Sequence, residues 1–246
     1  MDENRERARG LHKRQVKTLE NQVAGALVVI GAWYWVVVVL IAAVLLVVEL
    51  RTGEIGDGSV VERVLTSSRW FMFVMGLLIP FALLVPHVAA GGTRKAFVDG
   101  ITRGALVGGG LFGLVATLLF LIERPVFGAL DLAWFREGAA GPGNGFTSSV
   151  ISEALAVATF FLVGVAVSVA YSRFGGWVGT ALLPLFLVPA GLSQFLESGV
   201  VSDLVAPAAG LVQLLVLVGA SAVVLVLAIV VVDRLLHDVP IKPAVA

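Results

Sequence analysis

The run GALVVIGAWYWVVVVLIAAVLLVV, residues 25–48, decides the class of this protein. It contains no charged residue, and as an α-helix it would be about 36 Å long at about 1.5 Å per residue. The hydrocarbon core of a bilayer is about 30 Å thick, so the run predicts a membrane-spanning helix. It is too long for the apolar core of a signal peptide, and no small-residue cleavage site follows it. We therefore expect it to remain in the mature protein as an anchor.

The composition of the whole chain agrees with this prediction. Hydrophobic residues make up 59% of the 246 positions and charged residues only 14%, against about 25% charged in a typical soluble domain. So much apolar surface indicates a lipid solvent, in which helices satisfy their own backbone hydrogen bonds. The net charge is zero and no basic tract is interleaved with aromatic residues, which argues against a nucleic-acid partner. The absence of cysteine excludes disulfides and thiolate metal sites.

Six apolar runs have the length of a membrane span. The sequence therefore predicts an all-α, polytopic integral membrane protein with six transmembrane helices. The second and fifth runs contain prolines, which predict kinks. The fourth and fifth are joined only by the short turn SRFGG. The runs cover approximately Gly25–Val48, Trp70–Ala90, Gly104–Ile122, Val150–Tyr171, Trp177–Leu196 and Pro207–Val232.

The distribution of Lys and Arg predicts the orientation of these spans. With the amino terminus in the cytoplasm, twelve of the 17 Lys and Arg residues fall on the cytoplasmic side, which satisfies the positive-inside rule. An even number of spans returns the carboxyl terminus to the cytoplasm. We therefore divide the chain into a basic cytoplasmic segment (1–24), a six-helix transmembrane domain (25–232) and a short cytoplasmic tail (233–246).

The amino-terminal segment has an apolar side and a basic side when it is drawn as a helix. This pattern is typical of an amphipathic helix that lies in the headgroup layer, in contact with membrane lipid. A disordered basic tail that only fixes topology is the alternative interpretation. The apolar side is formed by Leu11, Gln15, Val16, Leu19 and Val23.

The spans contain little that would support catalysis. Glu153 follows Thr147, Ser148 and Ser149, which predicts a place in a first helical turn, where the helix dipole favours a carboxylate. The alternative is a polar contact in a transport path. The GPGNG stretch at 141–145 lacks the GK[ST] ending of a phosphate-binding loop, and no serine completes G-x-S-x-G. We therefore expect no enzyme active site, cofactor or metal in this chain, and disfavour an intramembrane hydrolase.

The third apolar run contains glycines at helical spacing. Gly104 and Gly108, then Gly109 and Gly113, form overlapping small-xxx-small pairs, which allow helix backbones to approach closely in lipid. We expect these glycines to pack helices, either within the chain or between two copies.

A short charged segment, GGTRKAFVDGITRG at 91–104, separates the second and third runs and is expected to face the cytoplasm. Thr93 can cap the helix that follows through its hydroxyl. Phe97 and Val98 would then be apolar anchors among charged neighbours, as on a docking surface. The competing interpretation is that Arg94, Lys95 and Arg103 only determine topology, and the sequence favours neither.

The stretch PHVAAGGTRKAF at 86–97 and the turn AYSRFGGWVG at 170–179 resemble the six-helix permeases of bacterial ABC-2-type ATP-binding-cassette exporters. The resemblance extends over nearly the whole chain, with its amphipathic amino-terminal helix, six spans and cytoplasmic ends. In such permeases the loop after the second span forms a coupling helix that docks on a separate ATPase subunit. The resemblance implies that Thr93, Arg94, Lys95, Ala96 and Phe97 make this contact.

The resemblance also implies the assembly and the activity. Two permease copies and two ATPase subunits in the inner membrane of a bacterial cell would export an amphiphilic peptide, lipid or drug, with ATP and Mg²⁺ bound in the ATPase. The family often has a re-entrant hairpin before its last span, and Glu197–Pro207 is the corresponding region here. The alternative function is a membrane scaffold or accessory subunit that docks a cytoplasmic partner and transports nothing.

Overall fold

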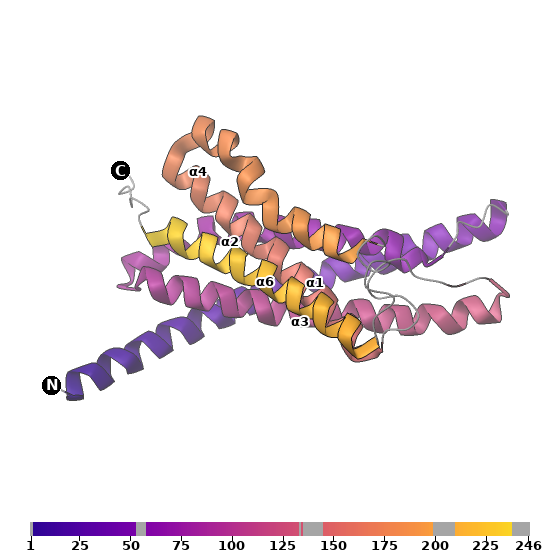
Figure 1. Ribbon diagram of the computed structural model, residues 1–246, viewed down its shortest axis with the longest axis horizontal. Coiled ribbons are helices and arrows are strands. Elements are labelled where there is room, and N and C mark those ends of the chain that lie inside the picture. Colours follow the sequence, from indigo (N-terminus) through magenta and orange to yellow (C-terminus); the bar gives the residue numbers. More distant parts are fainter. Residues whose placement is uncertain (1, 53–57, 133, 135–144, 199–209, 238–246) are drawn as a thin grey trace.

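The computed structural model describes residues 2–52, 58–132, 134, 145–198 and 210–237, and within them the chain forms helices and no strand. Five of these helices are long and apolar enough to cross a membrane, which supports an all-α, membrane-embedded protein. They run along a common long axis (Figure 1). In chain order they are α1 (Asp2–Thr52), α2 (Val60–Ala89), α3 (Arg94–Ala129), α4 (Phe146–Glu197) and α6 (Gly210–His237).

The first half of α4 is the centre of the bundle. Every residue from 156 to 170 is buried, and this stretch packs against α2, α3 and α6. Helix α1 lies outside this group, on α3 and to a lesser extent on α2. The buried stretch is apolar all round, as expected of a helix with neighbours on every side. The rest of the bundle therefore forms around α4.

Two glycines bring α2 and α4 into backbone contact. A methyl group placed on Gly76 of α2 would overlap the carbonyl oxygen of Phe161 in α4. A methyl group on Gly164 of α4 would overlap the carbonyl oxygen of Phe73 in α2. The contact is reciprocal, so neither backbone can retreat without losing both approaches. Small residues at such crossings increase van der Waals packing, which drives helix association in lipid.

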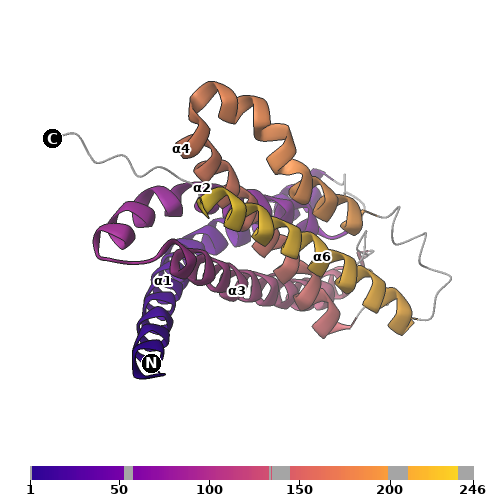
Figure 2. The same cartoon turned by 60° about the vertical axis from the view of Figure 1, so that its left-hand side comes forward.

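Helix α4 contains both the fourth and the fifth predicted spans. Its backbone leaves helical geometry at Gly175, where φ is 77° and ψ is 177°. This conformation is essentially restricted to glycine. The chain turns back on itself there (Figures 1 and 2), and Tyr171 and Thr180 hydrogen-bond across the turn through their hydroxyls at 2.9 Å. The structure therefore has five long apolar helices, one of them bent, and six separate crossings stay a prediction.

The amino-terminal segment is not a separate interfacial helix. Helix α1 is continuous from Asp2 to Thr52, with no break near residue 24, and its beginning projects from the bundle (Figure 2). The apolar side predicted for lipid contacts α3 instead, because Val16, Leu19 and Val23 are buried beside its glycines.

Several predicted boundaries also move. The segment after α2 forms no short helix of its own, because α3 begins at Arg94 and continues to Ala129. Helix α2 begins at Val60, ten residues before the predicted span, and α6 ends at His237. Both helices are longer than the predicted spans because they continue through polar residues at their ends, which a count of apolar residues leaves out. The region of the expected re-entrant hairpin lies almost entirely outside the described residues.

The two ends of the described chain lie at the same end of the bundle. The start of α1, the α2–α3 turn, the bend of α4 and the end of α6 gather on the left in Figure 1. Hydrogen bonds join them, including one from Arg94 to the carbonyl of His237 at 2.7 Å. The placement of both termini on the cytoplasmic side of a membrane stays a prediction.

The backbone contact between α2 and α4 predicts a large cost for small substitutions. Gly76→Ala and Gly164→Ala should each destabilise the protein by about 1–3 kcal/mol, because the added methyl group forces the helices apart. Gly110→Ala is the matched control, since its methyl group meets nothing within 4 Å. Thermal unfolding of the protein in detergent should show a lower Tm for the first two variants only. Equal Tm values for all three would contradict this packing.

Candidate functional site

The turn between α2 and α3 holds the predicted docking segment. Gly91 has a positive φ of 80°, and the amide groups of Gly91 and Gly92 donate to carbonyls of the last turn of α2. Thr93 has extended backbone, and its hydroxyl accepts a hydrogen bond from the amide of Ala96 at 3.1 Å. This is the N-cap geometry expected from the sequence. The hydrogen bonds that end α2 and the N-cap that starts α3 together fix the direction of α3 relative to α2.

The side chains of this segment divide into buried and exposed groups. Ala96 and Phe97 are fully buried, and the Phe97 ring lies 5.6 Å from that of His87 within the bundle. Phe97 is therefore part of the core and offers no apolar anchor to a partner in this conformation. Thr93 and Lys95 are exposed, and Arg94 is partly exposed. Any docking contact made here would depend on these three polar residues.

Residues from four helices hold this end of the bundle together. We call it the basic end face and define it by the amino-terminal part of α1, the α2–α3 turn, the bend of α4 and the end of α6. Gln15 of α1 donates to the carbonyl of Gly91 at 3.3 Å, and His12 lies 3.0 Å from the Asp99 carboxylate. Each contact joins α1 to the start of α3 or to the turn before it.

Two arginines of the basic end face cap the carboxyl end of α6. Arg94 donates to the carbonyl of His237. Arg173, at the bend of α4, donates to the carbonyls of Arg234 and Leu235 at 3.4 and 3.3 Å. Cationic side chains stabilise the last carbonyls of a helix and its dipole. The sequence suggested topology or docking for Arg94, and the structure adds this capping contact.

The four predicted packing glycines face two different neighbours. Methyl groups on Gly104 and Gly108 would overlap Val23 and Leu27 of α1. Methyl groups on Gly109 and Gly113 would overlap the backbone of α4, at Ala154 and Val150 respectively. Both pairs therefore pack helices within this chain, and α3 is held closely between α1 and α4.

Glu153 does not lie in the first turn of its helix. Helix α4 begins at Phe146, so Glu153 is two turns inside it and is 6% exposed. Its carboxylate pairs with Arg69 of α2 at 3.3 Å, and Arg69 also donates to the side-chain oxygen of Gln194 at 2.7 Å. The prediction of a dipole-stabilised first-turn carboxylate is therefore wrong. Arg69, Glu153 and Gln194 therefore join α2 to α4 both before and after its bend. Span counting missed this contact because it placed Arg69 outside the second span.

A second buried polar group lies at the end of the bundle opposite the basic end face. Glu123 of α3 is 7% exposed and accepts hydrogen bonds from Ser59, from the amide of Val61 at 2.8 Å and from the Trp134 indole at 3.0 Å. Ser59 and Val61 lie at the start of α2, where amides lack helical partners, whereas Trp134 lies beyond the end of α3. Glu123 thus fixes the start of α2 against α3.

Neither polar group has the composition of a metal centre. Within the described ranges, no group of three or more His, Asp or Glu side chains could hold a metal ion. Comparison with protein-family models, curated proteins and solved structures finds no match for this chain. Its function must therefore be argued from its own residues.

The Arg69–Glu153 pair predicts a distinctive pattern of stability. Arg69→Met should destabilise the protein by about 3–5 kcal/mol, because it leaves the Glu153 carboxylate buried without its charged partner. Arg69→Met combined with Glu153→Met should recover most of the loss, since it removes both charges. Thermal unfolding in detergent measures both effects, with Arg51→Met as the control at an exposed arginine. A double variant that is less stable than Arg69→Met would contradict this pairing.

Proposed function

We propose that this chain is the membrane-embedded permease subunit of an ABC-2-type exporter, energised by a separate ATPase. It would move an amphiphilic substrate outward as two copies of the chain assembled with two ATPase subunits. ATP and Mg²⁺ would bind to the ATPase, and this chain would contribute no catalytic residue. The observation that carries the proposal is the basic end face, where four helices present one joined surface at one end of an apolar bundle.

The architecture supports a docking role for this surface. The hydrogen bonds between α1, the α2–α3 turn, α4 and α6 allow a force applied at the turn to reach the start of α3 and the end of α6 together. Helix α3 then continues as one element from the turn to the opposite end. A partner that moved Thr93 would therefore move a helix packed closely on both α1 and α4.

The proposed contact is narrower than the sequence implied. Because Ala96 and Phe97 are buried, the ATPase would meet Thr93, Arg94 and Lys95, and Arg94 would act partly through its bond to α6. Charged groups at the edge of an interface contribute mainly to association rate and specificity. An acidic surface on the ATPase would complement Lys95.

We propose that the basic end face lies in the cytoplasm of a bacterial cell and that the chain spans the inner membrane. The positive-inside rule supports this orientation, because the start of α1, the start of α3 and the bend of α4 all lie at this end (Figure 1). These segments carry basic residues that include Arg94, Lys95, Arg103 and Arg173. An ATPase that uses cytoplasmic ATP could then reach the turn.

Reversing the charge of Lys95 tests the docking contact. The partner to test is an ATPase with the G-x-x-x-x-G-K-[ST] motif, if a neighbouring gene encodes one. Lys95→Glu should weaken its binding by about tenfold or more. Co-purification from membranes and titration in detergent measure the effect. Arg51→Glu makes the same charge change at an exposed residue of the opposite end, so it should bind normally.

Unchanged binding by Lys95→Glu would count against the docking contact. The transport role has a separate test, which is ATPase stimulation of the reconstituted pair across a panel of amphiphilic peptides, lipids and drugs. Normal docking without stimulation by any amphiphile would favour the scaffold or accessory function.

The orientation is testable because the chain has no cysteine. In intact cells, Lys95→Cys should resist a membrane-impermeant maleimide, while Leu130→Cys, exposed at the far end of α3, should react. Both should react after the cells are opened. Labelling of residue 95 in intact cells would refute the cytoplasmic placement of the turn, and with it the proposed function.

A further inference from the structure

The beginning of α1 contacts the rest of the bundle along one side only. Val16 and Leu19 are buried against α3. His12 and Gln15 bond to the start of α3 and to the turn before it. At about 100° per residue, these four residues lie within an arc of about 100° around the helix axis. The other side of this segment is not covered by the helices that the structure describes.

Three basic residues occupy that other side. We call them the basic stripe and define it as Lys13, Arg14 and Lys17, all of which are exposed. The stripe lies about 60–160° around the helix from Val16, away from the side that contacts the bundle. Lys17 is bonded to Glu20 at 2.8 Å. Within the described ranges, Lys13 and Arg14 have neither a hydrogen bond nor an ion pair.

The basic stripe continues into the lipid-facing side of α1. Val28 and Ala32 are exposed and lie about 120° and 160° around the helix on the same scale, in line with the stripe. Residues 25–48 carry no charge, and Lys17 precedes this run by eight positions, about 12 Å along the helix. Lys and Arg side chains lay their apolar stems along such a surface while the charged group stays at the membrane interface. A lipid whose chains lie against Val28 therefore has its headgroup beside the stripe.

The charge of the chain is divided between its two ends. The segments of the basic end face, with the chain ends that continue from them, contain twelve Lys and Arg against seven Asp and Glu (residues 1–24, 91–104, 170–179 and 233–246). The rest of the sequence contains five Lys and Arg against ten Asp and Glu. This count includes every charged side chain of the protein, also those outside the described ranges. An anionic headgroup is therefore favoured beside the first set of segments.

From this geometry and charge we propose that the basic stripe binds the phosphate group of an anionic phospholipid, whose acyl chains lie against α1 at Val28. Phosphate oxygens accept charge-assisted hydrogen bonds from Lys and Arg side chains. A soluble acidic partner fits this surface less well, because the stripe continues into lipid-facing residues. The inference goes beyond the proposed function, since it requires a membrane-embedded chain but neither an ATPase nor a particular orientation.

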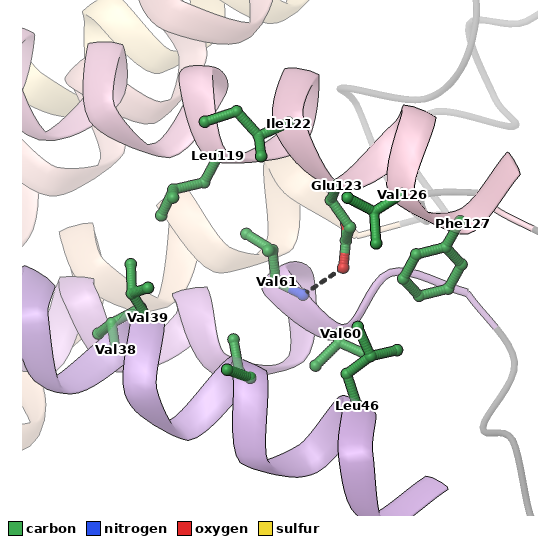
Figure 3. A pocket seen from close by; sticks show the side chains of 12 residues that line it. Val38, Val39, Leu46, Val60, Val61, Leu119, Ile122, Glu123, Val126 and Phe127 are labelled. Atoms are coloured by element: carbon green, nitrogen blue, oxygen red, sulfur yellow. Dashed lines mark hydrogen bonds between the residues drawn. The ribbon is translucent and has the colours of Figure 1, made fainter. Parts of the chain in front are cut away.

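The other end of α1 provides a comparison within the same helix. There Val38, Val39 and Leu46 border an apolar groove that α1 forms with α2 and α3 (Figure 3). The next residue, Val47, is 56% exposed, and Val28 is 51% exposed. A reporter at either valine therefore meets lipid, but only the one at Val28 lies in line with the basic stripe.

The experiment places a bimane label on a single cysteine of this otherwise cysteine-free chain, at Val28→Cys or at Val47→Cys. The protein is reconstituted into phosphatidylcholine nanodiscs in about 0.15 M salt, where the Debye length is about 8 Å. Quenching by a small fraction of lipid with a spin-labelled acyl chain then compares phosphatidylglycerol with phosphatidylcholine. At Val28 the preference for phosphatidylglycerol should be about fivefold or more, the effect of one basic residue near an anionic lipid. At Val47, about 45 Å along the helix from Lys17, the two lipids should quench within about twofold of each other.

Removal of charge from α1 tests which cations hold the lipid. Lys13→Gln combined with Arg14→Gln should lower the preference at Val28 by about threefold or more. Arg5→Gln combined with Arg9→Gln is the matched control, because it removes two exposed charges that lie about 10 Å farther along the same helix. The control should leave the preference within about 1.5-fold of its original value. Size-exclusion profiles confirm that both double variants are folded.

Equal quenching by the two lipids at Val28, or equal effects of the two double variants, would overturn the proposal. Decaglutamate added in the aqueous phase should leave the preference at Val28 unchanged. If it abolished that preference, the basic stripe would be a site for an acidic protein surface and the lipid site would be refuted. These measurements use this chain alone, so failure to find an ATPase partner would leave their outcome unaffected.

Discussion

The close approach of α2 and α4 is the contact on which the rest of this bundle depends. Lipid provides no hydrophobic force between helices, so association in the membrane relies on packing and polar contacts. Gly76 and Gly164 allow two backbones to touch, and the Arg69–Glu153 pair joins the same helices nearer one end. Helix α3 packs on α4 through Gly109 and Gly113. Two other glycines of α3, Gly104 and Gly108, pack against α1.

This packing makes the centre of the bundle differ from the contact between α1 and α3 at its outside. The central part of α4 is fully buried among its neighbours. Two apolar grooves lie instead between α1 and α3, where exposed side chains border them. Helix α3 extends as one continuous element from the basic end face to the opposite end of the bundle.

The candidate site was only partly predictable from sequence. The Thr93 cap follows from a local rule that pairs a hydroxyl with the third amide after it, and the structure contains that bond. Local rules could not place Phe97, because an amphipathic turn looks the same whether its apolar side meets a partner or its own bundle. Glu153 was misplaced for a related reason. Its charged partner is 84 residues away in sequence, and only tertiary packing brings the two together.

Sequence alone determined that this is an apolar, helical, membrane-embedded chain, because span length and missing charges are properties of continuous segments. It also located the glycine turn where α4 bends. Tertiary structure decided which helices contact one another and which side chains those contacts bury. It made α1 a single continuous helix, gave Arg94 and Arg173 the end of α6 to cap, and buried Glu123 between α3 and the start of α2. These outcomes depend on which faces meet, and no periodicity within one helix specifies its neighbour.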